Sequence, residues 1–216
     1  MSEKRRKLLK INHLEDGVEV DPDLWWETPL GQWIGQKVRL ALDNFMATSF
    51  GYYAISMGVN PELSGLLQNC RVRYRFHLGC SSDHADALAH SESWPVATDS
   101  TDLVVLNYAL SQANDPHALL REVNRVLIPD GKLVIIDFNP VSAWGLRHLF
   151  QGWLDRAPWN GHYYTARRVK DWASLLGFEL RGQSCNGHVL PLDMPRLLEK
   201  SRVLEKFSQR WLNFSG

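Results

Sequence analysis

The stretch TDLVVLNYAL at residues 101–110, followed by DPHALLREVNRVLIPDGKLVII at residues 115–136, decides the fold of this chain. Residues 103–106 are apolar and rich in β-branched side chains, as in a strand that is buried on both faces, and residues 133–136 repeat the pattern. The segment between them is long enough for a crossover helix. We therefore expect two parallel strands joined by a right-handed connection.

The crossover helix carries its own start and stop signals. Asp115 suits the N-cap and Pro116 the first helical position, and apolar residues then recur at helical spacing. The Pro-Asp-Gly sequence at residues 129–131 is expected to end the helix.

A family resemblance follows from the order of short motifs in this half of the chain. The order is Asp86-Ala87, Trp94-Pro95, Asp102-Leu-Val-Val and then LLREVNRVLIPDGKLVI. It resembles the second half of the small class I S-adenosylmethionine-dependent methyltransferases of the type 11 group, over about residues 50–185. The resemblance implies an α/β fold with a Rossmann-like, doubly wound, mostly parallel sheet. It also implies S-adenosylmethionine as cofactor and a small-molecule methyl acceptor.

The same resemblance indicates which residues would contact the cofactor. The first strand, expected at residues 51–58, ends with a single glycine where the family has a G-x-G-x-G turn, so the glycine-rich motif is degenerate. Asn60 suits the cap of a short following helix, whose N-terminus would favour the methionyl carboxylate. Asp86 would accept from the adenine amino group, or act only as a turn residue. The full set of expected cofactor residues is Gly58, Asn60, Asp86, Ala87, Asn107 and Tyr108.

The second strand, expected at residues 71–78, departs from the family. Three arginines and His77 alternate with apolar residues, which indicates one solvated face or, less directly, an anion site. The family's ribose-binding acid is missing at the strand end, and Asp83 is the first acid after it.

An aromatic and basic loop after the fifth strand is the candidate acceptor site. Its expected substrate residues are Trp144, His162, Tyr163 and Tyr164, which could hold a flat or anionic acceptor or only pack the loop. Thr165 should cap a helix that Gly177 closes, with a sixth strand from Phe178 onward.

The chain is expected to form one domain at residues 21–216, preceded by a flexible basic leader at residues 1–20. Within the domain we expect a lead-in helix at 22–48, an α/β core at 51–187 and a C-terminal helix at 195–211. The lead-in helix resembles the one that covers the cofactor end in the family, or it only packs on the domain with exposed aromatic residues at its start. In the lead-in helix, Thr28 should be the N-cap and Pro29 the first residue. The sequence stops before the family's last antiparallel strand, so a homo-oligomer could form through the exposed sheet edge or the C-terminal helix.

Composition narrows the class of protein further. Lys plus Arg and Asp plus Glu both number 24, so no net charge recruits nucleic acid. No apolar run approaches the ~20 residues of a membrane span, and three cysteines without C-x-x-C spacing suit a reducing cytoplasm. His77, His84 and His90, with Asp83 and Asp86, lack the spacing of metal ligands, so no metal is expected.

Two functions from different classes remain. The first is a methyltransferase that positions an acceptor for in-line attack on the sulfonium methyl group, which needs no dedicated base, so no catalytic residue is assigned. The alternative is a catalytically impaired methyltransferase-like protein that binds another nucleotide or anion, or a protein partner.

Overall fold

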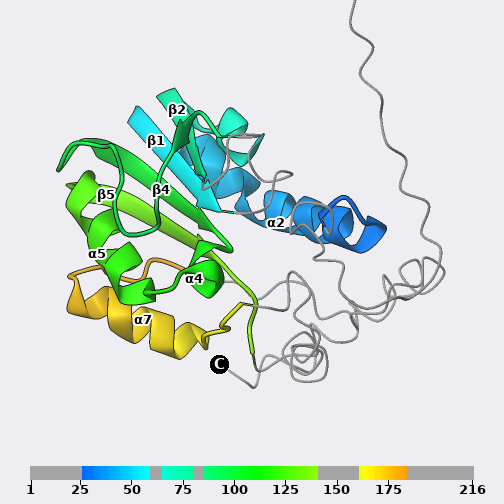
Figure 1. Cartoon of the computed structure of the whole chain (residues 1–216). Coiled ribbons are helices and arrows are strands. Elements are labelled where there is room, and N and C mark those ends of the chain that lie inside the picture. The colour runs from blue at the N-terminus through cyan, green and yellow to red at the C-terminus, as the bar shows by residue number, and fades with distance from the viewer. Residues whose placement is uncertain (1–25, 59–64, 80–84, 141–160, 184–216) are drawn as a thin grey trace, which may run out of the picture.

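The computed structural model describes residues 26–58, 65–79, 85–140 and 161–183 (Figure 1). The helices are α2 (Pro29–Thr48), the 3-10 helix η1 (Gly65–Asn69), α4 (Ala109–Gln112), α5 (Pro116–Val126) and α7 (Ala166–Leu175). The strands are β1 (Phe50–Gly58), β2 (Arg71–Gly79), β3 (Ala87–Leu88), β4 (Thr101–Asn107) and β5 (Leu127–Ile136). The expected leader, Asn60, Asp83, Trp144 and the expected C-terminal helix lie outside the described residues.

The five strands form one sheet in the order β3-β2-β1-β4-β5, and every neighbouring pair is parallel. This confirms the predicted parallel α/β sheet. Strands β2 and β3 lie on one side of β1, and strands β4 and β5 lie on the other. The order in which the chain adds strands therefore reverses between β1 and β4. In open α/β sheets ligands bind at the carboxyl ends of the strands beside such a reversal.

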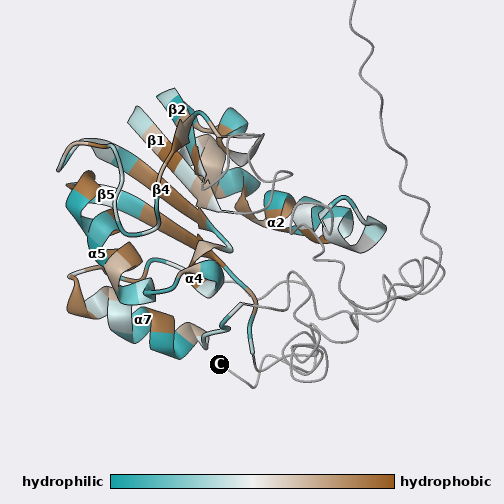
Figure 2. Ribbon diagram, viewed as in Figure 1, coloured by the Kyte–Doolittle hydropathy of each residue, from teal (hydrophilic) through white to brown (hydrophobic). Residues whose placement is uncertain are grey.

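Helices cover both faces of the sheet. Helix α2 packs on one face, and α5 and α7 pack on the other (Figure 1). Two apolar cores result, and Figure 2 shows the hydrophobic residues concentrated on the central strands between these layers. Strand β4 lies between both cores, with Leu103 and Val105 in one and Val104 and Leu106 in the other, which explains its continuous apolar sequence.

The start of the lead-in helix is as predicted, and the aromatic residue Trp26 before it is buried. The Thr28 hydroxyl accepts a hydrogen bond from the Gly31 amide at 3.2 Å, and Pro29 is the first helical residue. Of the two interpretations of this helix, the one with exposed aromatic residues is wrong for Trp26, which is fully buried because it packs on the rings of Tyr108 and Phe138.

Helix α5 also begins as predicted and ends earlier. The Asp115 carboxylate accepts from the amides of His117 and Ala118 at 2.8 and 3.0 Å. The helix ends at Val126, so the prediction that residues 129–131 end it is wrong. Leu127 is extended and pairs with Thr101 instead, which begins β5 six residues before the predicted strand.

Two further segments can be compared with the sequence predictions. The short helix expected after β1 is described from Gly65 onward, where Gly65–Asn69 form a 3-10 helix. Residues 178–183 form no strand, although the helix before them is capped by Thr165 and followed by Gly177 at φ 90° as predicted. Within the described parts of the chain, no helix is long and apolar enough to cross a membrane.

Candidate functional site

The carboxyl ends of β1, β4 and β5 meet at one edge of the sheet. Gly58 is in register with Asn107, and Asn107 with Ile136. Gly58 has φ 144°, and a Cβ atom at this position would lie 1.7 Å from the Asn107 carbonyl oxygen. Only glycine fits here, because any side chain would collide with the end of β4 and because L residues rarely adopt this φ.

Tyr108 directly follows β4 in the left-handed region, with φ 55°. Its amide donates to the Ile136 carbonyl at 2.8 Å, which ties the turn to the end of β5. Burial raises the pKa of its hydroxyl far above the usual value, and the negative charge of Asp137 adds to this shift. The phenol therefore stays protonated across the physiological range.

Four rings that are distant in sequence gather beside this edge, and we call them the aromatic cluster: Trp26, Tyr108, Phe138 and Tyr163. The centroid of Tyr108 lies 4.7 Å from Trp26 and 4.6 Å from Phe138. Phe138 in turn lies 5.4 Å from Tyr163. The cluster makes the surroundings of the strand ends apolar.

A carboxylate lies next to these rings. Asp137 follows β5, and its Oδ2 accepts from the Ser111 amide at 3.0 Å while Oδ1 accepts from the Phe138 amide at 2.8 Å. Desolvation raises the pKa of Asp137 to about 6, although these hydrogen bonds oppose the shift. Asp137 also raises the pKa of Tyr163, after the larger effect of burial. A carboxyl group with such a shift at the ligand-binding edge is typical of a functional site.

The expected substrate residues divide between two places. The His162 amide donates to the Ser111 carbonyl at 2.7 Å, and this contact pins the segment that carries Tyr163 into the aromatic cluster. The side chain of His162 is exposed. Tyr164 packs on Trp172 of α7 at 4.9 Å between centroids and does not join the cluster.

Asp86 and Ala87 lie at the amino end of β3. The Asp86 carboxylate accepts from the His77 amide at 2.7 Å, and the Asp86 amide donates to the His77 carbonyl at 2.9 Å. Asp86 thus bridges β2 and β3 before the strand begins. His90 follows the opposite, carboxyl end of β3.

The structure therefore brings together Gly58, Asn107, Tyr108 and Tyr163 from the sequence-based set. It adds Asp137, Trp26, Phe138 and Ser111, which were not assigned to the site. Asp137 had a usable signal, since it is the first residue after a strongly apolar strand. No group of three or more potential metal ligands occurs among the residues that the structure describes.

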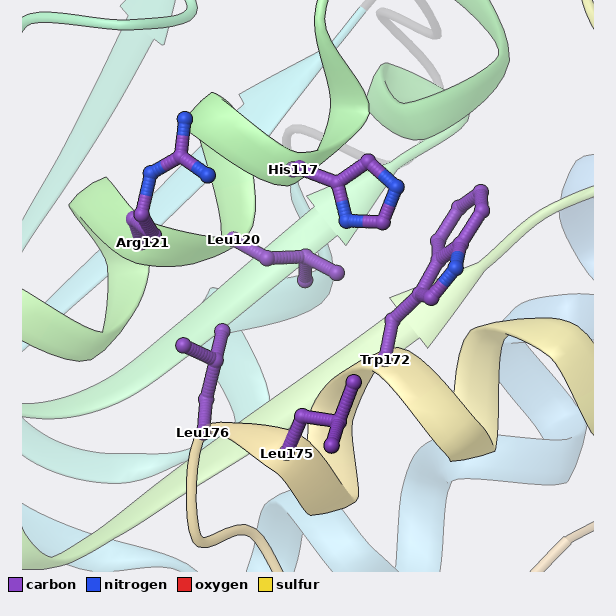
Figure 3. A pocket seen from close by; sticks show the side chains of 6 residues that line it. All are labelled: His117, Leu120, Arg121, Trp172, Leu175 and Leu176. Atoms are coloured by element: carbon purple, nitrogen blue, oxygen red, sulfur yellow. The ribbon is translucent and has the colours of Figure 1, made fainter.

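A shallow pocket of about 180 Å³ lies elsewhere, between α5 and α7. Figure 3 shows side chains from both helices around it, including His117 and Trp172, whose rings are 4.3 Å apart. None of the predicted site residues lines this pocket.

Comparisons with known proteins identify the family of the chain. A family model described as a methyltransferase domain matches residues 46–183. The uncharacterized protein YafS of Escherichia coli is 34% identical over 173 residues, covering 80% of this chain and 71% of that protein. Malonyl-[acyl-carrier protein] O-methyltransferase of Hahella chejuensis is 34% identical over 97 residues, covering 45% of this chain and 34% of that enzyme.

Solved structures show the same fold at low identity. A SAM-dependent methyltransferase from Thermotoga maritima superposes with a TM-score of 0.57 at 15% identity, covering 73% of this chain and 76% of that one. A structure of the complex between the Haloferax volcanii Trm112 methyltransferase activator and a methyltransferase superposes with a TM-score of 0.55 at 17% identity. The match covers 80% of this chain and 86% of that one. The fold is thus the Rossmann-like methyltransferase fold, as the sequence predicted, and S-adenosylmethionine is the cofactor of this class. This chain belongs to the methyltransferase domain family, in the class I, type 11-like group.

Proposed function

We propose that this protein is an S-adenosylmethionine-dependent methyltransferase that acts on a small-molecule acceptor. The observation that carries the proposal is the contact of Gly58 with Asn107 at the carboxyl edge of the sheet, within a chain of the methyltransferase family. The curated relatives do not identify one acceptor. Those with an activity in their names include a malonyl-[acyl-carrier protein] O-methyltransferase, a demethylmenaquinone methyltransferase, a ubiquinone/menaquinone biosynthesis C-methyltransferase and an aclacinomycin 10-hydroxylase.

The described residues fit such a cofactor at this edge. Gly58 leaves the end of β1 free of a side chain, and the apolar rings beside Tyr108 together with the Asp137 carboxylate suit a ligand that carries a positive charge. We assign cofactor contacts to Gly58, Asn107 and Tyr108, and we extend the set by family resemblance to Asn60, Asp86 and Ala87.

The bound cofactor would supply an electrophilic methyl group. The residues of the chain would orient an acceptor in line with that group and exclude water, since positioning alone lowers the barrier substantially. The segment at residues 161–165 is the natural wall of the acceptor site, because the His162 amide fixes it to α4. We place His162 and Tyr163 at this wall, with Tyr164 as its outer residue, and we keep Trp144 as a candidate from the sequence alone.

Isothermal titration calorimetry with S-adenosylmethionine and S-adenosylhomocysteine tests the cofactor assignment. We expect both to bind the full chain, and we expect Gly58→Ala to abolish binding while Gly182→Ala, whose added Cβ meets no atom within 4 Å, leaves it intact. Asp86→Ala should weaken both ligands alike if the carboxylate contacts adenine. No heat and no thermal shift at millimolar ligand would refute the proposal and favour a relative that has lost the cofactor.

A further inference from the structure

Asp137 is placed and surrounded as a recognition group for a cation. Its carboxylate follows β5 at the carboxyl edge, next to the strand that ends in Asn107. Two backbone amides, from Ser111 and Phe138, hold its two oxygens and fix their direction. These are neutral donors, so they orient the charge without cancelling it.

The groups that face Asp137 carry no compensating positive charge in the described part of the chain. From the β4 turn it faces Tyr108, from the segment at residues 161–165 it faces Tyr163, and from α4 it faces Ser111. Both tyrosines are held protonated by burial. No Lys, Arg or His of the described residues forms an ion pair with it.

The apolar surroundings strengthen the attraction of this carboxylate for a ligand cation. Trp26 is fully buried and Phe138 nearly so, which keeps water from the cluster side of the carboxylate. In a medium of low polarity, two unit charges at a given distance attract each other more strongly than in water.

We propose that Asp137 distinguishes the sulfonium cation of S-adenosylmethionine from the neutral thioether of S-adenosylhomocysteine. This inference rests on the proposed function and adds to it a preference for one form of the cofactor. The substrate form of the cofactor would bind more tightly than the product form, and loss of the positive charge on methyl transfer would weaken the hold on the product.

The inference predicts a specific dependence on pH. With a pKa of about 6, Asp137 is ionised in about a tenth of molecules at pH 5 and in about nine tenths at pH 7. The affinity for S-adenosylmethionine should therefore be about tenfold weaker at pH 5 than at pH 7, if only the ionised form attracts the sulfonium. The affinity for S-adenosylhomocysteine should change by less than about twofold from this source, because the thioether is neutral.

The experiment measures Kd for both ligands by calorimetry at pH 5, 6 and 7 on the full chain. The ratio of Kd for S-adenosylhomocysteine to Kd for S-adenosylmethionine cancels titrations that affect both ligands. We expect this ratio to rise about tenfold from pH 5 to pH 7 in the wild type. In Asp137→Asn it should be low and independent of pH, whereas the exposed control Asp130→Asn on the same strand should behave as wild type.

The outcomes separate this inference from the proposed function. If both ligands bind and the wild-type ratio stays constant across this range, the role of Asp137 is refuted while the cofactor assignment stands. The role of Asp137 is also refuted if the folded Asp137→Asn variant shows the same ratio of the two Kd values as the wild type. If neither ligand binds at any pH, both proposals fail. Should the variant not fold, the pH series on the wild type still decides the question.

Discussion

Glu122 and Arg125 form an ion pair within α5 and hydrogen-bond to the connection between β3 and β4, and Arg125→Ala tests how much these contacts contribute to stability. Arg125 contacts both oxygens of Glu122, with Nη2 to Oε1 at 2.7 Å and Nε to Oε2 at 2.8 Å. Its guanidinium also donates to the Val96 carbonyl at 2.9 Å and the Thr98 hydroxyl at 3.0 Å. Glu122 in turn accepts from the Trp94 amide at 2.7 Å.

The expected loss follows from burial. The Glu122 side chain is 11% exposed and that of Arg125 is 36% exposed, so the pair is partly screened by water. Removal of the guanidinium leaves a largely buried carboxylate and a carbonyl without this donor. We expect the free energy of unfolding to fall by about 2–3 kcal/mol, below the value for a fully buried pair and well above that for a surface pair.

Urea denaturation followed by circular dichroism measures this loss, with an unchanged m-value as the sign of an intact folded state. The matched control is Arg121→Ala on the same helix. Arg121 is 61% exposed and makes a single 3.6 Å contact with Asp115, so we expect a loss below about 0.5 kcal/mol. Equal losses in the two variants would refute the reasoning.

The pH dependence gives a second check. The side-chain hydrogen bonds from Arg125, and to a smaller extent the Trp94 amide, lower the pKa of Glu122. For a carboxyl group with a lowered folded-state pKa, the stabilisation is present above the unfolded value of about 4.3 and is lost as the pH falls through the folded value. The difference between wild type and Arg125→Ala should therefore be constant near neutrality and shrink below about pH 4.

Two further substitutions test the edge of the sheet. Gly58→Ala should destabilise the protein by about 2–4 kcal/mol in urea denaturation, because its Cβ would lie 1.7 Å from the Asn107 oxygen, and Gly182→Ala should be neutral. A neutral Gly58→Ala would contradict the close approach of β1 and β4. Trp26→Ala should cost about 3–5 kcal/mol because the ring is fully buried, against less than about 0.5 kcal/mol for Leu40→Ala, whose side chain is 69% exposed. Similar losses for these two would mean that Trp26 does not pack as described.

The sequence predicted the parts of the fold that local signals specify. The apolar runs of β4 and β5, the caps Thr28 and Asp115 and the glycine after α7 all depend on neighbours along the chain. The end of α5 depends on a partner strand, and there the prediction was wrong. The pairing of Leu127 with Thr101 extends β5 through the Pro-Asp-Gly sequence, with a register shift between Thr101 and Leu103.

The candidate site was less predictable because it is assembled from distant segments. Gly58, Asn107 and Tyr108 could be named from the strand ends together with the family resemblance. The burial of Trp26 depends on Tyr108 and Phe138, which are far away in sequence. The raised pKa of Asp137 depends likewise on the segments that cover this residue, so the sequence around residue 137 could not indicate the pKa shift.

The energetics of Asp137 favour a role in binding over a role in stability. A carboxyl group whose folded-state pKa is raised from 3.8 to about 6 destabilises the fold as the pH rises through this range, by about 3 kcal/mol at pH 7. Asp137→Asn removes that penalty but loses one of the two acceptors for the Ser111 and Phe138 amides. We expect the variant to be about 1–2 kcal/mol more stable than wild type in urea at pH 7, and the gain to disappear near pH 4, where the wild-type carboxyl is protonated in the folded state.

That gain in stability should accompany a loss of affinity for S-adenosylmethionine, since the same charge that destabilises the free protein would attract the sulfonium. Residues that improve binding at the expense of the fold are typical of functional sites. The exposed control Asp130→Asn should change neither quantity. If Asp137→Asn were instead less stable than wild type at pH 7, the carboxylate would stabilise the fold as an acceptor for the Ser111 and Phe138 amides. A role of its charge in ligand binding would then be refuted.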